Sequence, residues 1–150
     1  MTRNIFPFLA ILIFSLPVFA GHYPIDSIQF PFPLPVKQLQ KNKVHTTLDL
    51  WKSTRTKKQQ RSLAGRLHLS LTRVQRFHDF CDLLRVRGIG PKVATVMQAA
   101  GIKNAAALAK ADPKALNERV KQTNKHLHVL GKLPGIEIVR WWVHYASSLK

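Results

Sequence analysis

The sequence predicts an all-α protein: a compact bundle of short helices that follows a signal peptide and a proline-rich linker. Apolar residues recur at spacings of three and four along several segments, which is the pattern of helices with one buried face. Residues that cap helices stand directly before these segments. The short apolar runs lack the alternation of period two and the paired turn residues that are typical of strands. We therefore expect roughly six or seven short helices and no sheet.

Residues 1–20 have the composition of a secretory signal peptide. Arg3 supplies a basic start, residues 5–19 are largely apolar, and Val18 and Ala20 occupy the −3 and −1 positions of a cleavage site. The apolar run is shorter than the ~20 residues that a membrane-spanning helix needs. We expect cleavage after Ala20 and export to the periplasm or the medium. The alternative is an uncleaved membrane anchor.

Residues 21–45 are predicted to be a linker, proline-rich at first and then basic. Four prolines punctuate its first part, and Phe30 and Phe32 alternate with them. This pattern favours an extended, polyproline-like backbone without a core of its own. The alternative is that the two aromatic rings pack on the domain or on a partner.

The domain itself is expected to cover residues 46–149, and its helices follow from caps and buried faces. A short helix after Thr46 should turn Leu48 and Trp51 inward, and Ser70 should cap the helix with the clearest apolar face. That face consists of Leu71, Val74, Phe77, Cys81 and Leu84. The predicted helices cover residues 47–52, 57–68, 71–84, 91–100, 105–110, 113–123 and 136–149, and residues 124–130 can add another turn or two of helix.

A glycine turn joins two of these helices. Gly88 and Gly90 permit backbone conformations that other residues resist, and Ile89 between them can point into the core. Pro91 suits the first position of a helix, where its missing N–H is not needed. The unpaired N–H groups of such a helix start form a site for a phosphate, which Lys92 in the first turn would also favour. The candidate contacts are Arg85, Arg87, Gly88, Ile89, Gly90, Lys92 and Val93.

Residues 86–94, Val-Arg-Gly-Ile-Gly-Pro-Lys-Val-Ala, resemble the hairpin of the helix-hairpin-helix superfamily. Its pattern is apolar-Gly-apolar-Gly followed by a short helix with small residues. The resemblance implies binding of the DNA backbone through the amides of the glycine turn, without reading of sequence. A second turn, residues 133–137, departs from the pattern because Glu137 replaces the second glycine and would repel a phosphate. We interpret that turn as structural.

The whole span of residues 46–149 is similar to a bacterial family of unknown function, which is related to tandem helix-hairpin-helix domains. The similarity implies the same tandem fold here. The segments that carry it are Arg-Ser-Leu-Ala at 61–64, Asp-Leu-Leu-Arg at 82–85, Ala-Gly-Ile at 100–102, Asp-Pro-Lys-Ala-Leu at 112–116 and Leu-Pro at 133–134.

The charge of the chain points to a polyanionic partner. It has 24 Lys and Arg residues against 7 Asp and Glu residues, a formal net charge of +17, which becomes +16 when residues 1–20 and their Arg3 are removed. Such an excess indicates binding to a polyanion or to an anionic surface. The segment 36–67 contributes nine basic side chains opposed only by Asp49.

These observations favour sequence-independent binding of DNA, or another polyphosphate, outside the cytoplasm. In compartment and motif the chain resembles the exported helix-hairpin-helix DNA receptors of bacterial competence. The alternative is a non-enzymatic envelope adaptor or structural protein that contacts anionic lipid, polysaccharide or a protein partner. A third possibility is a secreted effector that acts in a host.

We expect no catalytic residue, no metal and no cofactor. The acidic residues are scattered, so no carboxylate pair for hydrolysis is visible. Some DNA repair glycosylases share the hairpin and place a catalytic aspartate some way after it in a Gly-Pro-Asp setting, whereas this chain has Gly-Pro-Lys at residues 90–92. Cys81 is the only cysteine, which leaves no internal disulfide, and it lies one helical turn from His78 on an apolar face typical of a core. His126 and His128 lack the four-ligand spacing of a structural zinc site.

Overall fold

The computed structural model of the protein describes residues 22–149. Most of its helices begin directly after a residue whose side chain caps the helix. Thr46 and Thr56 each form a capping box, and the side chains of Ser70, Asn104 and Asp112 accept from the backbone three residues later. Local hydrogen bonding therefore sets most helix starts at the predicted residues. The predicted signal peptide, residues 1–20, lies outside the described residues.

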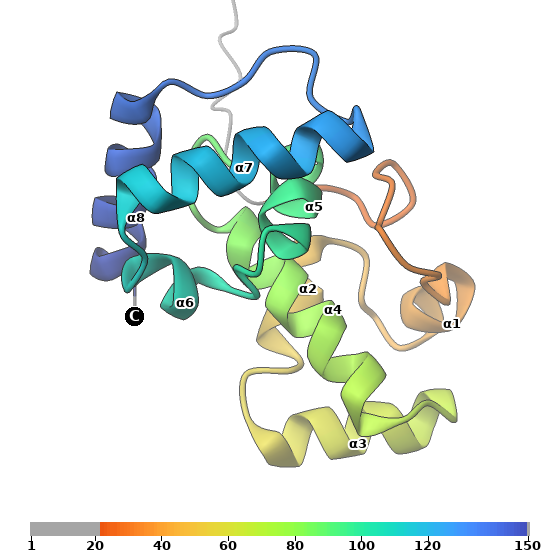
Figure 1. Cartoon of the computed structure of the whole chain (residues 1–150). Helices are drawn as coiled ribbons and strands as arrows, with labels where there is room; N and C mark the ends of the chain where they lie inside the picture. The colour runs from red at the N-terminus through yellow and green to blue at the C-terminus, as the bar shows by residue number, and fades with distance from the viewer. Residues whose placement is uncertain (1–21, 150) are drawn as a thin grey trace, which may run out of the picture.

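The described residues form eight α-helices and no strand beyond one isolated bridge between Pro24 and Thr46, so the all-α prediction is confirmed (Figure 1). The helices are α1 (Val36–Lys41), α2 (Thr47–Lys52), α3 (Lys57–Leu67), α4 (Leu71–Leu84), α5 (Pro91–Ala99), α6 (Ala105–Ala109), α7 (Pro113–Leu127) and α8 (Ile136–Ser148).

Helix α4 stands at the centre, with α3 at the lower end of the view and α5, α7 and α8 at the upper end (Figure 1). Its apolar side chains serve two adjoining cores. Phe77 and Cys81 pack with residues of α1, α2 and α3, whereas Phe80 and Leu84 pack with residues of α5 to α8. Burial of the predicted α4 face is confirmed for every member except Leu71, which is half-buried.

The segment predicted to be a linker is packed on the domain instead, at least from residue 22 onward. Ile25 is 1% exposed, the Phe30 ring lies 5.0 Å from that of Phe80, and the Phe32 ring stacks on Phe77 at 5.5 Å. The segment also contains α1, which the sequence did not predict. Apolar side chains spaced between the prolines explain the difference, because their burial outweighs the tendency of a proline-rich chain to stay solvated.

Backbone pairing holds the start of this segment in place. Tyr23 N–H donates to Thr47 Oγ1 at 3.1 Å, Thr47 N–H donates to the Tyr23 carbonyl at 2.9 Å, and Ile25 N–H donates to the His45 carbonyl at 2.9 Å. Residues 23–25 therefore lie beside residues 45–47, at the N-terminus of α2. This pairing brings Tyr23 to the glycine turn described next.

Candidate phosphate-binding turn

The turn between α4 and α5 has the conformation that its glycines predict, but only one of them needs to be glycine. Ile89 N–H donates to the Val86 carbonyl at 3.0 Å, and the Ile89 side chain is 2% exposed, which confirms that it points into the core. Gly88 has a φ of +85°, a left-handed conformation that favours glycine. Gly90 has φ −89° and ψ 176°, an extended conformation open to any residue.

The surroundings of the turn restrict Gly88 further. A Cβ added there would lie 3.1 Å from Nε1 of Trp142 and 3.8 Å from Cζ3 of Trp141, both on α8. A Cβ at Gly90 would lie 3.7 Å from the Tyr23 hydroxyl. Gly88 is nevertheless exposed to solvent, so the turn is bordered by α8 on one side and remains open.

The first turn of α5 lacks any side-chain cap. Gly90 occupies the N-cap position without a side chain, and Pro91 at the first helical position has no N–H. The backbone N–H groups of Lys92 and Val93 therefore receive no side-chain acceptor, and the Lys92 side chain is exposed, while Val93 is half-buried. Next to this helix start is a cavity of ≈ 520 Å³, lined by Pro91, Lys92, Thr95, Val129 and residues 27–31.

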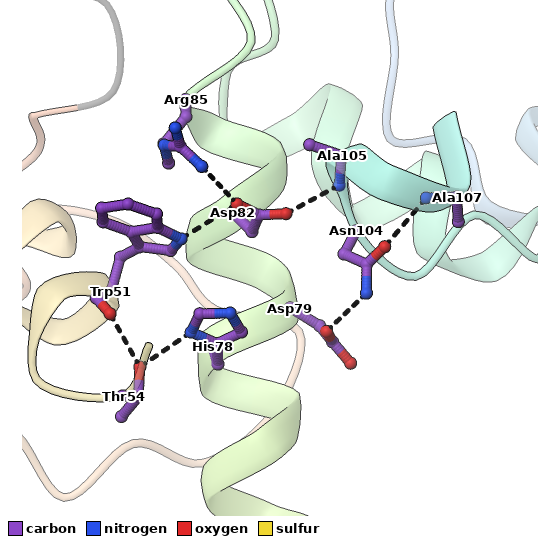
Figure 2. A network of polar contacts seen from close by, with 9 residues as sticks. All are labelled: Trp51, Thr54, His78, Asp79, Asp82, Arg85, Asn104, Ala105 and Ala107. Atoms are coloured by element: carbon purple, nitrogen blue, oxygen red, sulfur yellow. Dashed lines mark hydrogen bonds and ion pairs between the residues drawn. The ribbon is translucent and has the colours of Figure 1, made fainter. Parts of the chain in front are cut away.

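The structure separates the two arginines that the sequence placed together. Arg87 is exposed. Arg85 instead forms a 2.8 Å ion pair with Asp82, and its guanidinium lies 3.8 Å from the centre of the Trp51 ring (Figure 2). Only 18% of the Arg85 side chain is exposed. We therefore exclude Arg85 from the candidate contacts and retain Arg87 and Lys92.

Asp82 is the centre of a polar network that sequence reasoning missed (Figure 2). Besides Arg85, its carboxylate accepts from Trp51 Nε1 at 2.9 Å and from the backbone N–H of Ala105 at 3.0 Å. These bonds join α2, α4 and α6 directly below the turn. The sequence signal was weak, because one aspartate among apolar positions on a helix does not specify its donors.

A second group of polar contacts in the same region joins α4 to its neighbours. Thr54 Oγ1 and His78 Nδ1 lie 2.9 Å apart, and Asn104 Nδ2 donates to Asp79 at 2.8 Å (Figure 2). Burial lowers the pKa of His78, against the opposing effect of the Asp82 and Asp79 carboxylates. His78 is thus held in its neutral form at neutral pH.

Cys81 and the potential metal ligands are the remaining side chains with possible chemistry. Burial raises the pKa of the Cys81 thiol far above its ordinary value, and Asp82 adds to this effect. Cys81 is 1% exposed, which confirms its predicted burial. Across residues 22–149 we find no group of three or more His, Cys, Asp or Glu side chains arranged to hold a metal ion.

The second turn leads into α8, where Glu137 lies in the first helical turn as predicted. Its carboxylate is exposed and pairs with Arg140 at 2.9 Å. The turn itself spans residues 128–135, and Gly135 at its end has a φ of −72°, so the left-handed glycine of the first turn has no counterpart there.

Together these features define a small, basic, all-α domain with an open glycine turn between two central helices. Residues 32–149 match the model of a family described as a domain of unknown function, DUF4332, and the chain belongs to that family. The match begins within the proline-rich segment, in agreement with the packing of that segment on the domain. No curated protein and no solved structure matches the chain. None of the helices in residues 22–149 is long and apolar enough to cross a membrane.

Proposed function

We propose that the protein is exported and binds DNA, or another polyphosphate, without sequence specificity through the turn at residues 88–93. In this proposal the turn is a helix-hairpin-helix hairpin and the protein is not an enzyme. The observation that carries it is the uncapped start of α5, where unpaired amides and the exposed Lys92 meet beside an open left-handed glycine.

Two physical arguments support a phosphate as the ligand. Amides at a helix N-terminus carry partial positive charge and point along the helix axis, which suits an anion. A lysine in the first turn is unfavourable for the helix alone but favourable once a phosphate is bound there. Arg87 on the other side of Gly88 adds a second exposed cation, so a backbone with regularly spaced phosphates would contact both.

The overall charge supports binding that is salt-dependent and independent of sequence. Neutralisation of backbone phosphates releases counterions, so affinity falls steeply with salt, and the Kd is typically ~10⁻⁴–10⁻⁶ M at physiological salt. Arg85 makes no phosphate contact in this proposal, because Asp82 and Trp51 hold its guanidinium.

The test compares Lys92→Glu with Lys58→Glu in the protein that begins at Gly21. Both lysines are exposed at the second position of a helix, so each substitution makes the same change of charge at the same helical position. An acid suits both positions, so the helices should persist. Lys58 belongs to α3, at the opposite end of the view from α5 (Figure 1).

Binding to two labelled duplexes of unrelated sequence is measured across a salt series. We expect similar affinity for both duplexes, a loss of about tenfold or more for Lys92→Glu and a loss of less than about threefold for Lys58→Glu. Equal losses would mean that bulk charge, and not the turn, binds DNA. Absence of DNA binding at low salt, together with binding to vesicles of anionic lipid, would support the envelope adaptor instead.

A further inference from the structure

An exposed aromatic face lies on α8, on the same side as the glycine turn. Trp141 is 41% exposed, and its ring stacks on Tyr145 with centroids 5.1 Å apart and planes inclined by 26°. Ile138, one turn earlier, is 50% exposed. These three residues recur at the spacing of one helical face, while the opposite face of α8 buries Val139 and Ala146. The core therefore does not account for Trp141.

Trp142 adds a hydrogen-bond donor at the same place. Its side chain is 4% exposed, and within residues 22–149 its Nε1 donates no hydrogen bond. The indole N–H of a buried tryptophan usually has a partner. This nitrogen is not among the fully enclosed polar atoms that lack a partner, so it reaches the surface, and it does so beside Gly88, 3.1 Å from where a Cβ would lie. The glycine turn thus has an unpaired, partly accessible donor beside Gly88.

We propose that the turn and the Trp141–Tyr145 face form one binding site for single-stranded nucleic acid, an inference that rests on the function proposed above. The Trp142 N–H and Arg87 contact the phosphate backbone at Gly88, and an unpaired base stacks on Trp141. The adjacency of Gly88 to both indoles makes the two contacts parts of a single site.

A stacking site selects single strands because the faces of paired bases are already covered by their neighbours in a duplex. An aromatic side chain stacks with any base, so this contact keeps the independence of sequence. Glu137, the acidic residue nearest along α8, is paired with Arg140 and so repels the backbone less. The net charge of +17 also favours a polyanion over a protein partner or a second copy of the chain.

The experiment measures the affinity of the protein that begins at Gly21 for three labelled probes at one salt concentration. The probes are a twelve-residue thymidine oligonucleotide, an abasic oligonucleotide of the same length and a duplex of twelve base pairs. The abasic probe has the same phosphates without bases, so it reports the backbone contacts alone. Melting of each variant, followed by circular dichroism, checks that the fold is retained.

Trp141→Ala is the main variant, and Trp141→Phe, which keeps an aromatic ring, is its matched control. We expect Trp141→Ala to weaken binding of the thymidine oligonucleotide by about tenfold and to change binding of the abasic probe and the duplex by less than about twofold. Trp141→Phe should lose distinctly less. An equal loss for all three probes, or no loss for the thymidine oligonucleotide, would overturn the stacking proposal.

Trp142→Phe tests the donor, because it keeps most of the buried volume and removes the N–H. We expect about a tenfold loss for the thymidine and abasic probes alike, since a hydrogen bond to a charged phosphate is lost. Unchanged affinity would remove Trp142 from the site.

The outcomes also separate this inference from the function on which it rests. If no probe binds, or if Lys92→Glu has no effect, the proposed phosphate site fails. If duplex binding depends on Lys92 but Trp141→Ala binds the thymidine oligonucleotide as the unmodified protein does, only the stacking site fails. If the unmodified protein sediments as a dimer and Trp141→Ala as a monomer, with unchanged affinity for every probe, the face is a contact between copies and the proposal is overturned.

Discussion

Removal of the Asp82 carboxylate should destabilise the protein more than removal of its partner Arg85. In Asp82→Ala three donors lose their acceptor: the Ala105 N–H, which is buried, and the side-chain donors of Trp51 and Arg85, which are partly buried. A buried donor without a partner costs about 1–3 kcal/mol, and each of the other two bonds contributes about 1 kcal/mol. The sum is about 3–5 kcal/mol, a large part of the roughly 5–15 kcal/mol that stabilise a small domain.

Urea unfolding followed by circular dichroism measures this difference as a shift of the midpoint at constant slope. Arg85→Ala is the comparison: it leaves Asp82 bonded to Trp51 and Ala105, so only the ion pair and the contact with the Trp51 ring are lost, and its cost should be about 1–2 kcal/mol. Asp82→Asn, which keeps one acceptor oxygen, should fall between the two. A cost below about 1 kcal/mol for Asp82→Ala, or equal costs for Asp82→Ala and Arg85→Ala, would refute the reasoning that places Asp82 at the centre of the network.

Three further predictions concern the core, the pH dependence and the export of the protein. Phe77→Ala should lower the free energy of unfolding by ~3–5 kcal/mol, seen as a strong drop in melting midpoint, because Phe77 is fully buried; an unchanged midpoint would contradict its burial. Because burial lowers the pKa of His78 below its ordinary 6.5, protonation favours the unfolded state; stability should be full above about pH 6.5 and fall as pH decreases below it. His78→Gln should flatten this dependence between about pH 7.5 and 5, and equal slopes would show that other groups cause it. N-terminal sequencing of exported protein should begin at Gly21, whereas a full-length chain in the membrane would favour the anchor.

The helices could be predicted because their causes are local. Asn104 and Asp112, for example, are followed by helices at the expected residues, since a cap bonds a backbone amide only three positions away. The left-handed Gly88 and the inward Ile89 were also predictable from neighbouring residues. Faces were harder: Trp51 packs against the core as expected, but the fully buried leucine of α2 is Leu50, where Leu48 was expected. A helix of six residues has too few apolar positions to define its buried side.

The sequence by itself determined the all-α class, the main helix starts, the basic charge and the glycine turn, because each depends on composition or on residues a few positions apart. The tertiary structure alone decided which basic residues remain exposed: Arg85 is held by Asp82 and by Trp51, thirty-four positions earlier, whereas Arg87 is exposed. It also decided that residues 22–45 pack on the domain and that Trp142 meets Gly88. The physical reason is that these contacts join segments distant in the chain, and their energies depend on burial, which is created only when the helices come together.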